Sequence, residues 1–356
     1  MIIHCIDETR GRLFLAAEFL SFLNNLNERT ILTLPRESNA LYGSYFDLFP
    51  KIELQIGKSS FLEEAADVAL RFREGLPRTI KQDELLYPLL GHDELSGWQE
   101  GLARHRESVI PYDASSDISG KFGADLDSAK DLLNRKCSAN DLSGKRFLIS
   151  AGPTAEDIDP VRFLTNRSTG KMGLALARAA FIRGAEVRLV MGPSALRTPA
   201  CLHTKRVRSA REMAESIFGY FDESDIYVGA AAIADYTPAS PQSDKIKKGI
   251  NEFQLPLHRT TDILRELSRR RKTQLLVGFS VETEREFEHS KNKLEKKNLD
   301  FIVINNPKQP GSGFAADTNR VSIYSKEGHF RKYPLLSKDE VSHLILDIIK
   351  ERIEMR

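Results

Sequence analysis

The sequence of 356 residues is poor in cysteine, in long apolar runs and in net charge, and each shortage excludes a class of protein. Its three cysteines, Cys5, Cys137 and Cys201, are odd in number and far apart, which argues against a disulfide framework and a zinc site. No apolar run approaches the roughly 20 residues that span a bilayer, and the first residues meet acid and arginine too early for a secretion signal. We therefore expect a cytoplasmic protein with no membrane partner.

An excess of charge of either sign is also missing. The formal net charge is +2, from 52 Lys and Arg against 50 Asp and Glu. Such a balance gives no global field for nucleic acid, so any anion has to be bound by local clusters. With 41% hydrophobic residues, a chain of this length suits two globular domains with cores of their own.

A polar connection at 137–144 (CSANDLSG) separates two stretches of different regularity. We place a domain boundary there, between a smaller domain over 1–140 and a larger one over 141–356. The smaller domain opens with a strand, a helix and a second strand, which predicts an α/β domain. Its expected strands are 2–6, 29–34 and 108–112, and its expected helices are 12–27, 60–74, 95–107 and 126–135.

The larger domain alternates apolar strands with helical patterns. This alternation predicts an α/β fold with a Rossmann-like, open, mostly parallel sheet and helices on both faces. An added hairpin and a closing helix follow. The expected strands are 146–150, 186–191, 225–231, 274–279 and 300–305, the helices 171–183, 209–221, 261–271, 284–298 and 337–353, and the hairpin 321–325 with 330–335.

Ligands of such sheets bind beyond the carboxyl ends of the strands, so the loops there are candidate sites. The first loop ends in Ser168, Thr169, Gly170 and Lys171, which open a helix. Small residues at a helix N-terminus suit a phosphate, and Lys171 adds a full charge. An ordinary helix start remains the alternative, because the motif has neither the P-loop spacing nor the dinucleotide GxGxxG pattern.

Two further loops carry small and basic residues. GAAAIADY begins with Gly229, Ala230 and Ala231, which let a flat ring lie against the backbone, and it presents the carboxylate of Asp235. KIKKG at 245–249 places three lysines in four positions, an arrangement that can clamp phosphates. The alternatives are tight packing of the small residues and a solvated basic loop.

Aromatic and basic residues follow the fourth strand of the larger domain. Phe279 could pack on a base or in the core. The next helix carries Lys293 and Lys297, which are four residues apart and share one face, where a solvated basic surface is the alternative. The polar loop GFAADTN at 313–319 could line a cleft.

Together and in this order, these motifs resemble the synthetase half of the bacterial coenzyme A bifunctional flavoprotein family. The matching stretches are LSGKRFLISAGPT (142–154), DPVRFLTNRSTGKMG (159–173), GAAAIADY (229–236), KIKKG (245–249), DILREL (262–267), VGFSVET (277–283), KLEKKNLDFIVINN (293–306) and GFAADTN (313–319). They are long and ordered, and they cover most of the larger domain.

The resemblance implies a phosphopantothenate–cysteine ligase of coenzyme A biosynthesis. A nucleoside triphosphate activates the carboxylate of 4′-phosphopantothenate, pyrophosphate leaves, and the amine of cysteine attacks the acyl-nucleotide. The bacterial form of the motifs implies CTP with Mg²⁺ rather than ATP, although no residue is identified as a metal ligand. The family also implies a homodimer or a larger homo-oligomer.

Site residues carry over from the family by position. Asn166 matches the asparagine that holds the acyl-nucleotide, Arg162 the arginine of the second half-reaction, and Lys245 the lysine needed to form the intermediate. The implied nucleotide contacts are Gly229, Ala230, Ala231, Asp235, Lys245, Thr261, Asp262, Ile263, Leu264, Phe279, Lys293 and Lys297. Thr261 departs from the family pattern, which has proline there, whereas Asp262 is retained.

The first 140 residues fit the flavin-dependent decarboxylase half of the same family only in part. Residues 89–113 resemble the end of that domain. Where the family cradles the flavin phosphate, this chain has Asp7, Glu8, Thr9 and Arg10, and two carboxylates there would repel a phosphate. We therefore expect a degenerate flavoprotein-like domain over 1–140 that binds no FMN and has no decarboxylase activity.

Two alternatives to the ligase stay open on the sequence. One is another nucleotide enzyme on a Rossmann-like sheet, against which the missing GxGxxG pattern argues. The other is a catalytically silent nucleotide-binding or scaffold protein. The joint presence of Arg162, Asn166, Asp235 and Lys245 argues against the second alternative.

Overall fold

The computed structural model describes residues 2–7, 29–34, 52–56, 68–74, 84–89, 126–247, 254–282 and 286–356. The chain divides into two compact units, Met1–Ala139 with Pro199–Cys201 and Asn140–Thr198 with Leu202–Arg356. No helix among these described residues is long and apolar enough to cross a membrane.

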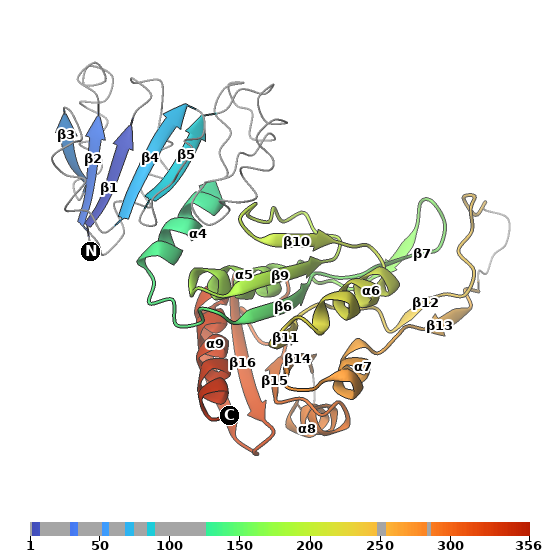
Figure 1. Ribbon diagram of the computed structural model, residues 1–356. Coiled ribbons are helices and arrows are strands. Elements are labelled where there is room, and N and C mark those ends of the chain that lie inside the picture. Colours follow the sequence, from blue (N-terminus) through green and yellow to red (C-terminus); the bar gives the residue numbers. More distant parts are fainter. Residues whose placement is uncertain are drawn as a thin grey trace. The chain divides into compact units, whose positions relative to one another are not determined.

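The first unit contains a five-stranded parallel sheet in the order β3-β2-β1-β4-β5 (Figure 1). Its elements are β1 (Ile2–Asp7), β2 (Arg29–Leu34), β3 (Ile52–Ile56), β4 (Val68–Glu74), β5 (Glu84–Leu89) and α4 (Leu126–Cys137). The predicted strands at 2–6 and 29–34 and the predicted helix at 126–135 are confirmed. The elements predicted at 12–27, 95–107 and 108–112 lie outside the described residues.

The prediction of a helix over 60–74 is wrong for residues 68–74, which form β4 between β1 and β5. Val68, Leu70 and Phe72 occupy alternate positions, with Arg71 and Arg73 on either side of Phe72, and this period of two is typical of a strand. Alanine and glutamate just before β4 favour a helix, so the helical signal was extended too far. The strands β3 and β5 lie where the sequence signal is weak, and the sequence did not predict them.

The second unit is built on an eight-stranded sheet in the order β10-β9-β6-β11-β14-β15-β16-β17 (Figure 1). Its strands are β6 (Arg146–Ala151), β9 (Glu186–Met191), β10 (His203–Arg206), β11 (Ile226–Gly229), β14 (Leu275–Val281), β15 (Phe301–Asn305), β16 (Thr318–Ser325) and β17 (Phe330–Ser337). The pairs from β10 to β15 are parallel, whereas β16 and β17 are antiparallel. The predicted mostly parallel sheet and its added hairpin are confirmed, although β10 was not predicted.

Helices cover both faces of this sheet, as predicted. They are α5 (Lys171–Ile182), α6 (Ala210–Phe221), α7 (Ile263–Arg270), α8 (Glu286–Lys296) and α9 (Lys338–Glu354). Helices α5 and α9 pack on each other, whereas α6, α7 and α8 contribute to one core on the other face (Figure 1). Leu148, Leu276 and Ile302 lie on three central strands and belong to that core. Successive side chains of a strand point to opposite faces, and these three point to the face that α6, α7 and α8 cover.

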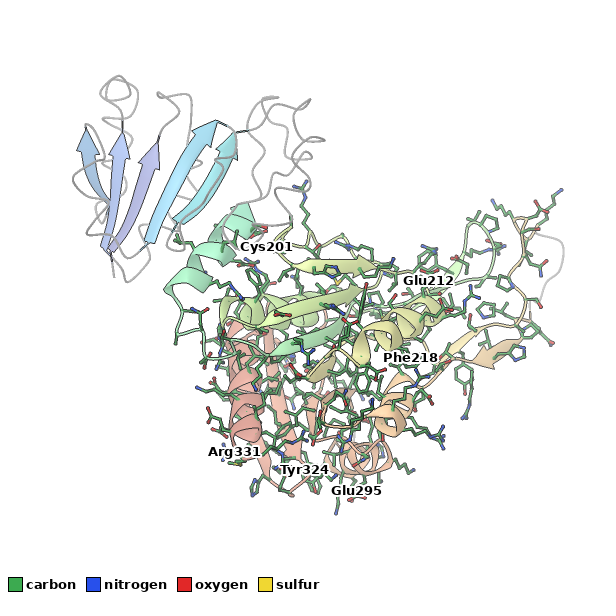
Figure 2. All side chains as sticks on the ribbon, viewed as in Figure 1. Cys201, Glu212, Phe218, Glu295, Tyr324 and Arg331 are labelled. Atoms are coloured by element: carbon green, nitrogen blue, oxygen red, sulfur yellow. The ribbon has the colours of Figure 1, made fainter. Side chains whose placement is uncertain are left out.

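The core on the α6–α8 face extends to the antiparallel edge of the sheet. Tyr324 of β16 is buried in it, and Phe218 packs against it (Figure 2). Phe330 packs against the same core. The ring of Phe287 meets the ring of Tyr324 edge-on at 5.1 Å between centroids, a favoured aromatic geometry. This packing joins α8 to the hairpin of β16 and β17.

Local capping explains where the last helix begins. The Oγ atom of Ser337 accepts a hydrogen bond from the backbone N–H of Glu340 at 3.1 Å, and the Glu340 carboxylate accepts one from the N–H of Ser337 at 2.7 Å. This capping box satisfies two N–H groups that a helix start leaves unpaired. The helix predicted at 337–353 is confirmed.

Two short hairpins interrupt the loops at the carboxyl edge of the sheet. They are β7 (Ala155–Asp157) with β8 (Phe163–Thr165), and β12 (Tyr236–Pro238) with β13 (Leu257–Arg259). Each strand has three residues, which is too short for a periodic signal, and the sequence did not predict them.

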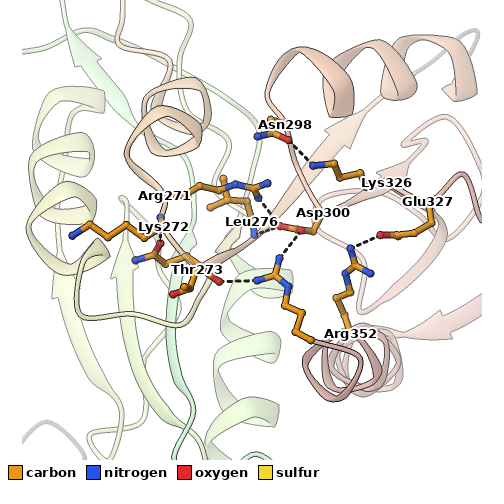
Figure 3. A network of polar contacts seen from close by, with 11 residues as sticks. Arg271, Lys272, Thr273, Leu276, Asn298, Asp300, Lys326, Glu327 and Arg352 are labelled. Carbon is orange, nitrogen blue, oxygen red and sulfur yellow. Dashed lines mark hydrogen bonds and ion pairs between the residues drawn. The ribbon is translucent and has the colours of Figure 1, made fainter.

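At the opposite, amino-terminal edge of the sheet, one buried carboxylate joins several segments (Figure 3). Asp300 accepts hydrogen bonds from Arg271 at 2.7 Å, from the N–H of Leu276 at 2.9 Å and from Arg356 at 2.9 Å. Arg356 also donates to the carbonyl of Thr273 at 2.7 Å. These bonds connect the start of β14 and β15 with the end of α9.

Candidate functional site

The carboxyl ends of β6, β11 and β14 meet at one edge of the sheet, because these strands are parallel neighbours. A cavity of about 430 Å³ lies there. Its walls come from the end of β11 and the loop after it, from the start of α7, from the end of β14 and from α8. The lining residues are Ser150, Tyr227, Gly229, Ala231, Ile233, Asp235, Tyr236, Arg259, Thr260, Thr261, Asp262, Ile263, Leu264, Phe279, Lys293 and Lys297.

Most of the predicted nucleotide contacts line this one cavity. They are Gly229, Ala231, Asp235, Thr261, Asp262, Ile263, Leu264, Phe279, Lys293 and Lys297. Other predicted site residues, although described, are not among those that line it, namely Ala230, Arg162, Asn166, Lys245, Ser168, Thr169, Gly170 and Lys171. The structure therefore separates the predicted residues into a cavity group and groups beside it.

Small residues shape the wall at the end of β11. A side chain at Gly229 would come within 3.2 Å of the ring of Tyr227 and 3.5 Å of Leu264, so it would push into the cavity wall. The N–H of the next residue, Ala230, donates to the carbonyl of Ser150 at 3.1 Å. That bond continues the pairing of β11 with β6 and explains why Ala230 turns away from the cavity.

A buried hydroxyl pair lies at the base of the cavity. The Oγ of Ser150 and the phenol oxygen of Tyr227 are 3.0 Å apart, and both residues are buried. Burial raises the pKa of Tyr227 to about 12, so the phenol stays protonated and neutral. The base of the cavity is thus polar but uncharged.

Lys293 of α8 and Lys297, which directly follows this helix, bring positive charge to the cavity. The ammonium group of Lys293 donates to the carbonyl of Phe279 at 3.1 Å, and burial followed by the charge of Lys297 lowers the pKa of Lys293. Lys297 forms an ion pair with Asp262 at 2.9 Å. Asp262 also caps α7 by accepting a hydrogen bond from the N–H of Arg265 at 3.2 Å, so one carboxylate connects the start of α7 to the residue that follows α8.

The carboxylate of Asp235 stands on a segment that is fixed through its backbone. Its carbonyl accepts the N–H of Thr260 at 3.0 Å, and the hydroxyl of Thr260 donates to the carbonyl of Ala234 at 2.6 Å. Asp235 itself is exposed, at the mouth of the cavity. A carboxylate held in this way can accept hydrogen bonds from an amino group or contribute to metal binding.

Asn166 is held directly beside the cavity segment. Its side-chain amide donates to the carbonyls of Ala232 and Ile233 at 3.0 and 3.2 Å. The neighbouring hydroxyl of Thr165 donates to the carbonyl of Thr154 at 2.7 Å, which fixes the loop that carries Asn166. Because both amide hydrogens are used, the side-chain oxygen is the atom of Asn166 left to receive a donor from a ligand.

Arg162 and the segment of Lys245 lie together at the β7–β8 hairpin. The guanidinium group of Arg162 pairs with Asp159 at 2.5 Å and donates to the carbonyl of Ile246 at 3.0 Å. Lys245 is exposed next to Ile246. The structure thus brings together the two predicted catalytic cations by their segments, outside the cavity lining.

The start of α5 forms the third group. Gly170 precedes the helix at φ 86°, where a side chain would meet Met191 at 2.5 Å, and no side chain caps the first turn. Thr169 donates to the carbonyl of Phe314 at 2.9 Å, and Lys171 pairs with Asp317 at 2.6 Å. The helix start is therefore open to an anion through its backbone N–H groups.

Several residues at the site were missed by the sequence reasoning. Ser150, Tyr227, Arg259 and Thr260 line the cavity, and Asp159 binds Arg162. Each of these residues lies within or close to a recognised motif, and that position was the available signal. Residue type alone did not distinguish them from core or turn residues.

Fold and cavity together define an open α/β protein whose cavity lies beyond the carboxyl ends of parallel strands, the place where such folds bind ligands. A family model described as "DNA/pantothenate metabolism flavoprotein C-terminal domain" matches residues 142–353. The chain belongs to this family. The match covers the cavity, the β7–β8 hairpin and the start of α5, so all three groups of predicted residues lie within it.

Known relatives match the same part of the chain. This chain is 49% identical over 209 residues to the coenzyme A biosynthesis bifunctional protein CoaBC of Bacillus subtilis (strain 168). The matched residues cover 58% of this chain and 52% of that protein. This chain is also 47% identical over 219 residues to a cysteine/cysteine sulfinic acid decarboxylase of an unknown prokaryotic organism. The matched residues cover 61% of this chain and 60% of that protein. The matched region thus spans about half the length of these curated relatives.

Solved structures share this fold. The crystal structure of the C-terminal domain of a coenzyme A biosynthesis bifunctional protein CoaBC superposes with a TM-score of 0.53 and 41% sequence identity. The superposition covers 61% of this chain and 100% of the solved chain. The whole of that solved domain therefore has a counterpart in this chain.

Proposed function

We propose that residues 141–356 form a phosphopantothenate–cysteine ligase of coenzyme A biosynthesis that uses CTP. A carboxylate oxygen of 4′-phosphopantothenate attacks the α-phosphorus of CTP, and the bond to pyrophosphate breaks. The amine of cysteine then attacks the acyl carbon and loses a proton, while CMP leaves and the amide remains. The observation that carries the proposal is the single cavity lined by Asp235, Phe279, Lys293 and Lys297, together with the similarity to proteins named CoaBC.

The cavity supports nucleotide binding by its composition. Gly229 and Ala231 offer a flat backbone surface, and Phe279 offers a ring face to a base. Lys293 and Lys297 offer point charges to a triphosphate. The Asp235 carboxylate would accept a hydrogen bond from the exocyclic amino group of cytosine, which favours a base with a hydrogen-bond donor at that position.

Magnesium fits the cavity only as an ion that binds together with the triphosphate. The described residues hold no group of three side chains that could form a metal cage. Asp235 and Asp262 are the carboxylates that line the cavity, and Mg²⁺ commonly takes one or two carboxylates and completes its shell with water and phosphates. Such an ion would neutralise charge on the phosphate oxygens.

Asn166, Arg162 and Lys245 are proposed to act on the acyl-nucleotide. The free side-chain oxygen of Asn166 would accept a hydrogen from the incoming amine, because its amide hydrogens are bonded to Ala232 and Ile233. Arg162 and Lys245 would stabilise the charges on the leaving CMP and pyrophosphate. Holding the amine beside the activated acid contributes further, by analogy with intramolecular reactions worth roughly 7–11 kcal/mol.

The start of α5 is proposed to bind the phosphate of the acid substrate. Its unpaired N–H groups carry partial positive charge, and Ser168, Thr169 and Lys171 add donors around Gly170. The pairing of Lys171 with an exposed carboxylate, Asp317, costs little to exchange for a phosphate.

We further propose that the chain forms a homodimer through the two short hairpins. Val161 and Phe163 lie on the β7–β8 hairpin and Tyr236 and Leu257 on the β12–β13 hairpin, and all four are large apolar side chains exposed by 42–58%. Strands β7 and β12 are in contact, so the two hairpins lie side by side, and we propose that these side chains contribute to one interface. A second copy of the chain would cover it, and size-exclusion chromatography with light scattering would give twice the monomer mass.

The first 140 residues are proposed to bind no FMN and to have no decarboxylase activity, within a cytoplasmic protein. The carboxylates expected near a flavin phosphate support this proposal. Purified protein should be colourless, and a visible flavin absorption band would contradict it.

The proposed function is tested by adding phosphopantothenate, cysteine and Mg²⁺ with either CTP or ATP and measuring pyrophosphate release. We expect release with CTP and at least about 10-fold less with ATP, a difference of about 1.4 kcal/mol in transition-state stabilisation. Binding of CTP without release would favour the silent nucleotide-binding alternative. No binding of CTP would refute the assignment.

A further inference from the structure

Asp159 is the most heavily bonded side chain of the β7–β8 hairpin. Its carboxylate accepts hydrogen bonds from the N–H groups of Val161 and Arg162, both at 2.8 Å, and from the Arg162 guanidinium at 3.0 and 2.5 Å. It also accepts the N–H of Ile246 at 3.1 Å. The Asp159 side chain is wholly shielded from solvent, so these bonds are not exchanged with water.

The Asp159 carboxylate and the Arg162 guanidinium group together bind the backbone N–H and the backbone carbonyl of Ile246. Asp159 receives its N–H, and Arg162 donates to its carbonyl at 3.0 Å. A further bond runs from the N–H of Gln242 to the carbonyl of Ile158 at 2.9 Å. The segment that carries Lys245 is therefore attached to the hairpin at two points, one on each side of Lys245.

Charge strengthens this attachment. The guanidinium of Arg162 and the three backbone N–H groups hold the pKa of Asp159 well below its usual range, so the carboxylate is ionised under all working conditions. Charge-assisted bonds of this kind are about twice as strong as neutral ones. An amide in place of the carboxylate would accept fewer of the five donors and would repel the guanidinium N–H groups with its own NH₂.

We propose that Asp159 is the positioning residue that fixes Arg162 and Lys245 relative to each other, and so couples the two half-reactions. The inference rests on the proposed function, in which Lys245 serves formation of the acyl-cytidylate and Arg162 serves its conversion to the amide. Asp159 has no free oxygen lone pair to spare for a substrate, because five donors already converge on it. Its effect is therefore exerted through the two cations.

The test compares both half-reactions in full-length variants. Formation of the acyl-cytidylate is measured as CTP–pyrophosphate exchange without cysteine, and its conversion as single-turnover amide formation after cysteine is added. We expect Asp159→Asn to slow both steps by about 100-fold, since a displacement of about 1 Å can have that effect. Lys245→Met should slow mainly the first step, and Arg162→Met mainly the second.

A matched control lies two residues away. Asp157 lies on the same hairpin and forms a bidentate ion pair with Arg208 at 3.0 and 2.6 Å, but the Asp157 side chain is 47% exposed. Asp157→Asn removes the same charge from the hairpin without touching Arg162 or Ile246. Both of its half-reaction rates should stay within about 3-fold of the wild type, as expected for an exposed pair.

Amide hydrogen exchange gives a readout that does not depend on activity. The Ile246 N–H should exchange at least about 10-fold faster in Asp159→Asn than in Asp157→Asn, because its acceptor is lost. If the wild-type protein releases no pyrophosphate while the Ile246 N–H still exchanges faster in Asp159→Asn, the proposed function is refuted and the positional link stays intact. Unchanged exchange, or a folded Asp159→Asn protein with both rates near those of Asp157→Asn, would overturn the inference.

Discussion

The buried carboxylate of Asp300 allows a stability prediction with a worked magnitude. Its side chain is 2% exposed and receives Arg271, which is 14% exposed, and Arg356, which is 38% exposed. Asp300→Asn keeps the shape but leaves two guanidinium groups without their counter-charge (Figure 3). Breaking a buried pair costs roughly 3–5 kcal/mol, and we expect about 3 because Arg356 can reach solvent.

This loss should be visible as a shift in thermal unfolding. A unit of roughly 200 residues changes its Tm by about 2–4 °C per kcal/mol, so Asp300→Asn should lower the Tm by about 6–12 °C. The control is Asp347→Asn, which breaks an ion pair with Arg183 at 2.6 Å in which Asp347 is 64% exposed. An exposed pair contributes about 0–1 kcal/mol. Equal Tm shifts in the two variants, measured by circular dichroism, would refute the reasoning.

Three further predictions concern charge and chemistry. Because burial lowers the pKa of Lys293, its ammonium group loses its proton earlier as the pH rises. The affinity for CTP, measured by calorimetry, should therefore fall with pH above neutrality. The fall should be at least about 3-fold steeper than in Lys293→Arg, whose charge persists. The Arg183 hydrogen bond lowers the pKa of Asp141 from 3.8 to about 2, so its stabilisation is present above about pH 4 and lost as pH falls toward about 2. Asp141→Asn should then be less stable than the wild type by about 1 kcal/mol near neutral pH, and urea unfolding should show this gap close in acid. Asn166→Ala should accumulate acyl-cytidylate, visible by mass spectrometry, with turnover lowered by about 100-fold; normal turnover would remove Asn166 from the mechanism.

The second unit was predictable because its strands and helices carry strong periodic signals. The strands β6, β9, β14 and β15 are apolar runs, since both of their faces are covered by helices. The start of α9 follows from a capping box that can be read directly from Ser337 and Glu340. Local signals and the tertiary fold agree here, so the sequence analysis predicts both element type and order.

Other parts depend on tertiary contacts that no local pattern contains. The three-residue strands β7, β8, β12 and β13 exist because loops pair with each other across the edge of the sheet. The strand β4 was predicted as part of a helix because an alanine- and glutamate-rich stretch precedes its alternation. Asp159 escaped notice because its importance comes from Ile246, which lies 87 residues further along the chain.

On the proposed function, nucleotide binding and chemistry are carried by different structural elements. The cavity is built on the ends of core strands and on α7 and α8, which share one hydrophobic core. Asn166, Arg162 and Lys245 instead stand on loops and a short hairpin. Hydrogen bonds to backbone carbonyls position Asn166 and Arg162, and Lys245 is held through its neighbour Ile246. Asp159 and Arg162 hold the Lys245 segment through charge-assisted bonds, so we expect the hairpin and this segment to move as one unit. On the proposed function, we expect the bound substrates to bridge the cavity and this unit, so the cations need not line the cavity before the substrates bind.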